Sequence, residues 1–352
     1  TPFGTVVSTN ITPDAATGIG SWSFSAFQRA MREGIARDGR HLYPAFPYTA
    51  FTQVGDDDLQ SLYAWLMTQP AVVSQPPASA LKFPFDQRPL MALWNALHLQ
   101  PGPAHAVAER SEQWNRGAQL VNGLGHCSAC HTPRDAMGAE RRDDAYLQGA
   151  MVDGWEAPAL GAAARRPWTE DQLVGYLRRG HDRDHGIAGG SMASVVRGLA
   201  QLPDADVRAM AHYLVSLQPA VVPAVSSDDL LARSQAQART LRGPAQRLFE
   251  QACGACHHDG DGPPVLGLNH PLALNGDLHS ARPDNVIRSV IDGIRDPVFV
   301  EIGHMPAFGD ALDDAQIAEL LAYMRQRFAP GEPAWTDLRG AVARLRKATA
   351  AR

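Results

Sequence analysis

Apolar side chains recur at helical spacing in several stretches of the chain, and signals for the start or the end of a helix flank them. One stretch runs from Trp168 to Arg179 and a second covers residues 286–291, and each is followed closely by a glycine, Gly180 or Gly293. Glycine just after a periodic stretch is typical of a helix end. Acidic residues open two later stretches that contain an aromatic residue, over residues 203–214 and 313–324. The pattern predicts a middle helix and a closing helix, in two copies.

The first hundred residues contain the same pattern a third time. One helical stretch runs from Trp22 to Gly34, and another opens at the acidic run 56–58 and continues to residue 66. Their apolar side chains have the spacing that buries one face of each helix. The residues predicted for this buried face are Trp22, Phe27, Leu59, Leu62, Tyr63 and Leu66.

Length and composition are those of a folded protein with more than one domain. The chain has 352 residues, of which 45% are apolar and 20% charged, so neither a disordered nor a collagen-like chain is indicated. Its net charge of −5 lacks the basic surplus of a nucleic-acid binder. No apolar run approaches the roughly 18 residues of a membrane span, and Thr1 opens no signal-like segment. We therefore expect a soluble or peripheral protein.

The cysteines form two copies of one motif. The motif reads Cys-X-X-Cys-His, and its copies comprise Cys127, Cys130 and His131, and Cys253, Cys256 and His257. In c-type cytochromes the two thiols bind haem through thioether bonds and the adjacent His binds the iron. The competing interpretations are a redox-active cysteine pair, a zinc half-site and two structural disulfides. Two copies that use all four cysteines, without further zinc ligands at suitable spacing, favour two haem sites with the histidines as proximal ligands.

A six-coordinate electron-transfer haem needs a second axial ligand, and a Met thioether raises its reduction potential. Met192 follows Gly180 by twelve residues, and Met305 follows Gly293 by the same twelve. A lone Met is usually core filler, but the shared offset predicts these two as sixth ligands. Several histidines also lie near the haem segments, and none has a matching offset: His126, His181, His185, His258 and His304.

The first copy has Phe46 at the position of the ligand methionine. Trp22 precedes Phe46 by 24 residues, as Trp168 precedes Met192. Phenylalanine has no atom that binds iron, so a haem in this copy would need its sixth ligand from elsewhere. A matching haem motif would fall upstream of residue 1. We therefore expect the first domain to be truncated at its N-terminus, with a third haem only if the natural protein carries that motif.

Four further segments carry a more specific pattern. They are residues 1–4 (TPFG), 8–13 (STNITP), 37–45 (RDGRHLYPA) and 114–117 (WNRG). With the haem motifs, they resemble the multihaem cytochrome c subunits of bacterial membrane-associated dehydrogenases, and the resemblance covers nearly the whole chain. Members of that family normally have three Cys-X-X-Cys-His motifs, so this chain departs from the pattern in having two.

Residues 83–91 (FPFDQRPLM) and Phe46 are similar to one branch of this family. That branch serves molybdenum-hydroxylase dehydrogenases, which oxidise aldehydes or N-heterocycles. The alternative is the branch that serves quinoprotein or flavin dehydrogenases of alcohols, gluconate and fructose. The resemblance also places Arg134, three residues after His131, where it would pair with a haem propionate; the competing interpretation is a solvated loop arginine.

The resemblance implies electron transfer, with no active site in the chain itself. A larger dehydrogenase subunit would oxidise the substrate, together with a small iron–sulfur subunit, and electrons would pass along the haems c to ubiquinone or a terminal oxidase. Covalent haem attachment belongs to the periplasmic side in bacteria, so the implied location is that face of the inner membrane, held peripherally. The alternatives are a dihaem peroxidase, which the two matched methionines disfavour, and a stand-alone shuttle cytochrome.

Together these interpretations predict an all-α chain of three tandem cytochrome c-like domains. The first covers residues 1–98 and lacks its haem motif, the second covers 99–224, and the third covers 225–352. Linkers are expected near residues 70–82 and 218–235. No catalytic base, nucleophile or substrate pocket is expected.

The chain should bind two covalent haems c, because four cysteines form two thioether pairs. Mass spectrometry of the denatured protein measures this directly, since thioether-bound haem stays attached. A mass with one added haem, or with none, would contradict the assignment.

Overall fold

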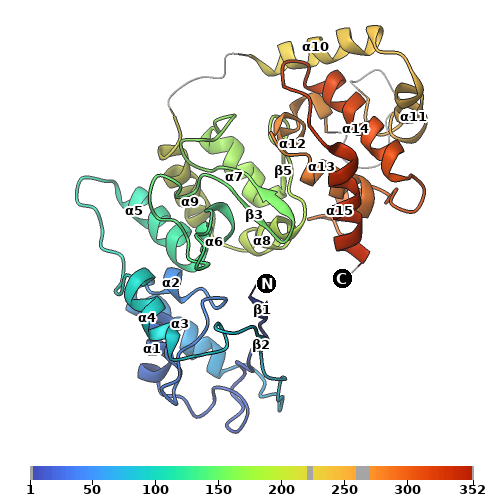
Figure 1. Ribbon diagram of the computed structural model, residues 1–352. Helices are drawn as coiled ribbons and strands as arrows, with labels where there is room; N and C mark the ends of the chain where they lie inside the picture. Colours follow the sequence, from blue (N-terminus) through green and yellow to red (C-terminus); the bar gives the residue numbers. More distant parts are fainter. Residues whose placement is uncertain (1–2, 220–224, 259–269, 351–352) are drawn as a thin grey trace. The chain divides into compact units, whose positions relative to one another are not determined.

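The computed structural model describes residues 3–219, 225–258 and 270–350, and helices dominate them (Figure 1). The chain forms two compact units. Unit 1 consists of Thr1–Ala129 and Asp135–Glu140, and unit 2 consists of Cys130–Arg134 and Arg141–Arg352. Within the described residues, every helix is too short or too polar to cross a lipid bilayer.

Unit 1 is built from short helices and one small ribbon of two strands. The ribbon pairs β1 (Gly4–Thr5) with β2 (Ala80–Leu81) in antiparallel register. The helices are α1 (Phe24–Glu33), α2 (Tyr48–Phe51), α3 (Asp56–Met67), α4 (Leu90–His98), α5 (Glu112–Gln119) and the π-helix η1 (Leu120–Leu124). The helix α6 (Ser128–His131) follows, and its last two residues belong to unit 2.

The core of unit 1 lies where α1 and α3 meet. Phe27 and Leu59 are buried there, together with Ile19, Met31 and Val54. The other residues predicted for this face pack around them partly buried, namely Trp22, Leu62, Tyr63 and Leu66. The prediction of a folded apolar face in the first hundred residues is confirmed.

Unit 2 contains the remaining elements, most of them helices. In chain order they are β3 (Ala150–Val152), β4 (Trp155–Ala157), α7 (Glu170–Arg179), β5 (His181–Asp182), β6 (Gly186–Ile187), α8 (Ser191–Leu199), α9 (Asp204–Ser216), α10 (Ser227–Thr240), α11 (Pro244–Ala252), η2 (Leu272–Leu274), α12 (Gly276–His279), α13 (Asp284–Asp292), η3 (Val300–Ile302), α14 (Asp314–Phe328) and α15 (Leu338–Ala350). The strands form antiparallel pairs, β3 with β4 and β5 with β6.

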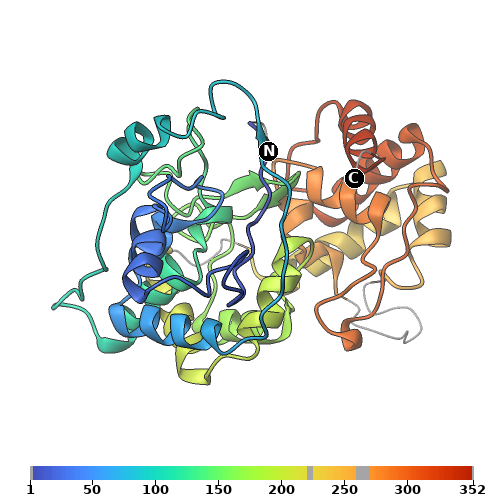
Figure 2. The same cartoon turned by 90° about the horizontal axis from the view of Figure 1, so that it is seen from below.

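The C-terminal half of unit 2 has its own core around α14. This helix contacts α10, α11 and α15, and α15 also contacts α13; the orange and red helices lie together in both views (Figures 1 and 2). Phe249 is 1% exposed, and its ring centroid lies 5.4 Å from that of Phe328 and 5.6 Å from that of Tyr323. In the preceding part of the unit, α7 packs against both α8 and α9.

The middle helices end where the sequence predicts. Helices α1, α7 and α13 are followed at once by Gly34, Gly180 and Gly293, whose φ angles are 65°, 73° and 69°. Only glycine adopts such angles without a steric penalty, so it allows the chain to reverse directly after the helix. The starts of α7 and α14 are equally local, since each has a capping box, formed by Thr169 with Gln172 and by Asp313 with Gln316.

The chain after each of these glycines turns back on itself. The amide of Leu42 donates to the carbonyl of Gly34, and the amide of Ala188 donates to that of Gly180, both at 2.7 Å. Isolated antiparallel bridges pair Ile35 with His41 and Ile294 with Met305. The predicted repeats therefore share a local shape at the position where a ligand loop is expected.

One predicted linker contains a helix. The sequence pattern predicts a linker near residues 218–235. Helix α10 begins at Ser227 within this range, and Ser226 accepts a hydrogen bond from the amide of Asp229 at 3.1 Å. Ser followed by acidic residues is a common helix start. Residues 220–224 of the same linker lie outside the described part of the chain.

Replacing Gly293 with Ala should destabilise the protein. The new Cβ would lie 2.6 Å from the Met305 carbonyl oxygen and 2.7 Å from the Ala307 nitrogen, at a positive φ that costs a non-glycine residue about 1–2 kcal/mol. Gly198→Ala is the matched control, because Gly198 lies in α8 with open space around it, and should stabilise by about 0.5–1 kcal/mol. Denaturant unfolding measures both changes; equal midpoints for the two variants would contradict this account.

Candidate haem sites

The backbone changes direction just before the first Cys-X-X-Cys-His motif. Helix α5 continues into η1, and His126 then adopts a φ of 35°. The amide of Cys127 donates to the carbonyl of Val121 at 3.1 Å. Single π-turns are frequent at functional sites because they shift the residues that follow onto another face. Here the shift immediately precedes the predicted thioether cysteines.

His131 is held in the tautomer that a haem iron requires. Its side chain is buried, and Nδ1 lies 2.7 Å from the carbonyl oxygen of Pro158. A carbonyl only accepts, so Nδ1 carries the hydrogen and Nε2 keeps its lone pair for a metal. Burial lowers the pKa of His131, which keeps the imidazole neutral. His131 is thereby prepared to act as a proximal ligand.

The second motif follows α11 directly. The amide of Cys253 donates to the carbonyl of Phe249, and the amide of His257 donates to that of Cys253, both at 2.8 Å. Burial, reinforced by His258, lowers the pKa of His257. Nδ1 of His257 is buried and has no hydrogen-bond partner among the described residues. His257 is therefore also a neutral imidazole.

The predicted thioether cysteines differ in exposure. Cys127, Cys130 and Cys253 are partly buried, whereas Cys256 is exposed. Burial, reinforced by Cys256, raises the pKa of the Cys253 thiol to about 11, so this thiol stays protonated at neutral pH. In the described part of the chain no three His, Cys, Asp or Glu side chains gather as a metal-ion site.

The side chain of Met305 packs against the same apolar cluster as Cys253 of the preceding haem motif. Its amide and carbonyl both pair with Ile294, at 3.2 and 2.9 Å. Met305, Phe308 and Cys253 all pack, partly buried, against the apolar cluster around α14. The sequence assigned Met305 and Cys253 to one haem, and the structure places both against one cluster.

Met192 lies in the first turn of α8. Its amide is 3.2 Å from the carbonyl of Gly189, and its side chain is partly buried. It packs against a cluster whose buried members are Ala188, Ala193, Val196, Val298 and Ile302.

The competing histidines have other surroundings. The ring of His185 stacks on Trp168 with centroids 3.5 Å apart, and burial lowers its pKa to about 4. His304 is exposed, with Nδ1 2.9 Å from the carbonyl of Arg295. His126 lies 5.6 Å from the ring of Phe51. Each of these three histidines thus contacts a neighbouring residue through its ring or through a ring nitrogen.

Two other sequence candidates lie in contrasting environments. Phe46 is partly buried, and its ring lies 5.4 Å from that of Phe51 and packs against buried neighbours. Arg134 is exposed. Its contact with a haem propionate stays a prediction.

Two residues at these sites were missed by sequence reasoning. Pro158 contributes only a backbone carbonyl, which leaves no side-chain pattern to find. His270 is 6% exposed, and its pKa is lowered to about 4 by burial first and by His257 second, so the two imidazoles lie within electrostatic range. Sequence reasoning did not select His270, because no other repeat has a histidine at the matching offset.

Comparison with known proteins identifies the family. The family model "Cytochrome c" matches residues 114–218, and the model "Cytochrome C oxidase, cbb3-type, subunit III" matches residues 243–324. The gluconate 2-dehydrogenase cytochrome c subunit of Pantoea cypripedii is 37% identical over 99% of this chain and 82% of its own length. The chain belongs to the cytochrome c subunits of dehydrogenases.

Other relatives of this family are similar over nearly all of the chain. The fructose dehydrogenase cytochrome subunit of Gluconobacter japonicus is 34% identical over 93% of the chain and 72% of its own length. A nicotinate dehydrogenase subunit of Pseudomonas putida is 53% identical over 98% of the chain. The chain spans only 29% of that longer subunit.

Membership in this family identifies the cofactor as haem c. We refer to residues 114–218 as the central domain and to residues 243–324 as the C-terminal domain, and each contains one Cys-X-X-Cys-His motif. The residues present fit the group, since each motif offers two thiols and a neutral, largely buried imidazole. Haem c supplies an iron that changes between the ferrous and ferric states and so carries one electron.

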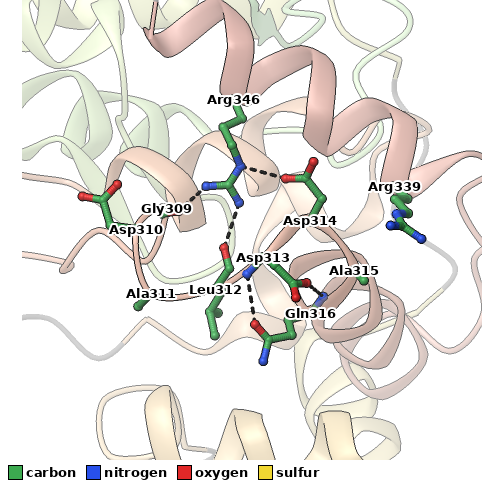
Figure 3. Close-up of a pocket in the computed structure, with 10 residues that line it drawn as sticks. All are labelled: Gly309, Asp310, Ala311, Leu312, Asp313, Asp314, Ala315, Gln316, Arg339 and Arg346. Carbon is green, nitrogen blue, oxygen red and sulfur yellow. Dashed lines mark hydrogen bonds and ion pairs between the residues drawn. The ribbon is translucent and has the colours of Figure 1, made fainter.

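A cavity near the end of the C-terminal domain is separate from the haem motifs (Figure 3). It is lined by residues 309–316 together with Arg339 and Arg346. Arg346 of α15 donates to Asp314 at 2.7 Å, to the carbonyl of Leu312 at 2.8 Å and to the carbonyl of Gly309. These hydrogen bonds attach α15 to the start of α14. The polar residues that line the cavity therefore have a structural role.

Replacing Met192 or Met305 with Ala should lower the reduction potential of one haem each, because the thioether that raises the potential is lost. Met151→Ala is the control, since Met151 is 41% exposed on β3. Spectroscopic redox titration should show one shifted wave in each ligand variant and none in the control. If either ligand variant titrates like the parent, His185 becomes the better candidate for that iron.

Proposed function

We propose that this chain is the electron-transfer subunit of a dehydrogenase complex of the molybdenum-hydroxylase type, which oxidises an aldehyde or an N-heterocycle. The observation that carries the proposal is the 53% identity to a nicotinate dehydrogenase subunit over 98% of the chain. The partner subunit oxidises the substrate, and this chain accepts the electrons one at a time at its two haem domains. No residue of the chain itself acts on the substrate.

The ligand set belongs to the same proposal. Cys127 and Cys130 attach one haem and Cys253 and Cys256 the other, with His131 and His257 as proximal ligands. Met192 and Met305 complete the two irons, and Arg134 contacts a propionate. Support comes from the buried neutral imidazoles and from the common cluster of Cys253 and Met305.

We also propose that the first segment is a third cytochrome c-like domain. In this division residues 1–98 lack a haem motif, residues 99–224 hold one haem and residues 225–352 hold the other. The shared reversal after Gly34, Gly180 and Gly293 supports three related units. Phe46, which stands at the ligand position of the first unit, contacts Phe51 within an apolar cluster and offers no donor atom to a metal.

The wider setting is part of the proposal as well. A small iron–sulfur subunit lies between the substrate-oxidising subunit and this chain, and ubiquinone or a terminal oxidase accepts the electrons. The complex is attached peripherally to the periplasmic face of the inner membrane. The motifs support that location, since covalent haem attachment takes place there in bacteria.

A second candidate is the cytochrome subunit of a quinoprotein or flavin dehydrogenase. It is favoured by relatives named for gluconate and fructose dehydrogenases, which this chain matches over 82% and 72% of their length. Identity to these relatives is 37% and 34%, against 53% for the nicotinate dehydrogenase subunit. The higher identity supports the first candidate.

Purification of the chain from its natural host through an affinity tag tests the proposal. A larger subunit should co-purify together with molybdenum and iron–sulfur clusters, detected by peptide mass spectrometry and elemental analysis. Anaerobic addition of the substrate should then reduce the haems, and a Cys253→Ala/Cys256→Ala variant should show half the haem reduction. A flavin or quinone cofactor in the larger subunit would favour the second candidate, and isolation of the chain alone would contradict both.

A further inference from the structure

Helix α8, which carries the predicted ligand Met192 in its first turn, is bonded to the C-terminal domain. Arg197 lies on α8, five residues after Met192. Its guanidinium lies 3.0 Å from the carboxylate of Asp296 and donates to the carbonyl of Pro297 at 3.3 Å. Both partners belong to the C-terminal domain, in the segment that leads to Met305. The ligand helix of one haem domain thus contacts the ligand segment of the other.

An apolar cluster continues this contact. Ala188, Ala193 and Val196 of the central domain are at most 5% exposed, and Val298 and Ile302 are 2% and 8% exposed. Met192 is partly buried against this cluster. Close packing in such a cluster restricts the positions that a flexible methionine side chain can occupy.

Val298 also contacts the first residue of the segment from Gly180 to Met192, which we call the Met192 loop. A Cβ added at Gly180 would lie 2.7–2.9 Å from the side-chain carbons of Val298, so the two residues are in tight contact. Gly180 begins the reversal that leads to Met192, and the amide of Ala188 closes that reversal on the Gly180 carbonyl at 2.7 Å. Val298 therefore packs against the beginning of the Met192 loop as well as near its end.

We propose that Val298 and Ile302 are positioning residues for Met192, so that axial ligation in the central domain depends on a segment of the C-terminal domain. The inference rests on the proposed ligation by Met192. Removing methyl groups from this cluster leaves space into which the loop relaxes. The methionine then competes less well with water or an added ligand for the iron.

The test uses the full chain carrying both haems. Val298→Ala and Ile302→Ala are compared with Val300→Ala, because Val300 lies between these two residues in the sequence and shares η3 with Ile302 but is 74% exposed. Met192→Ala identifies which redox wave belongs to the central domain. The measurements are the near-infrared charge-transfer band of methionine-ligated ferric haem, the two midpoint potentials, and the affinity for imidazole.

Val298→Ala and Ile302→Ala should weaken the near-infrared band, lower the potential of the wave that Met192→Ala lowers, and bind imidazole more tightly than the parent. Val300→Ala should match the parent. If Met192→Ala shifts neither wave, the proposed ligation is wrong. If Met192→Ala shifts a wave that the Val298 and Ile302 variants leave unchanged, the ligation stands and the positioning role is wrong.

If the alanine variants are isolated without both haems, a smaller substitution provides the test. Ile302→Val removes one methyl group and retains the branched shape, so the fold should be preserved. It should bind imidazole more tightly at the same haem, by a smaller factor than a full truncation. Imidazole affinity equal to that of the parent would overturn the proposal.

Discussion

The hydrogen bond between His131 and the carbonyl of Pro158 is the constraint on which the central haem site depends. It fixes the tautomer and the ring orientation of the imidazole, and it connects the haem motif to the end of β4. Strand β4 is itself fixed by the C-terminal domain, because Glu156 and Asn285 exchange two backbone–side-chain hydrogen bonds at 2.8 and 2.9 Å. The position of the His131 imidazole therefore depends on residues of the C-terminal domain, and the Met192 loop also packs against residues of that domain.

The elements that could be predicted from the sequence are those whose start or end depends on a few neighbouring residues. Glycine after a periodic stretch located the ends of α1, α7 and α13, and acidic starts located α9 and α14, because capping and backbone strain act within one turn. The haem motifs were equally legible, since covalent attachment requires two cysteines and a histidine at fixed spacing. The spacing from glycine to methionine likewise identified the candidate sixth ligands.

Other features could not be predicted because they join residues that are distant in the sequence. Pro158 acts through its backbone, and no side-chain pattern records an acceptor carbonyl. Asn285 is a polar residue buried at 8% exposure on α13, and from the sequence alone it would be assigned to the solvent face of that helix. In each case the partner lies on another element, and periodicity reports only which face of a helix is covered.

Arg288 on α13 shows that the two haem domains depend on each other for their packing. Its guanidinium is almost fully buried, donates to the carbonyl of Gly154 at 2.7 Å and pairs with Asp292 at 3.3 Å. A buried charge is tolerated only while such partners surround it. An isolated C-terminal domain would lose the carbonyl of Gly154, and an isolated central domain would lose the cation above Trp155. For anyone assembling artificial electron conduits from haem modules, the exchangeable unit is thus the pair, and a single domain becomes portable only after Arg288 is redesigned.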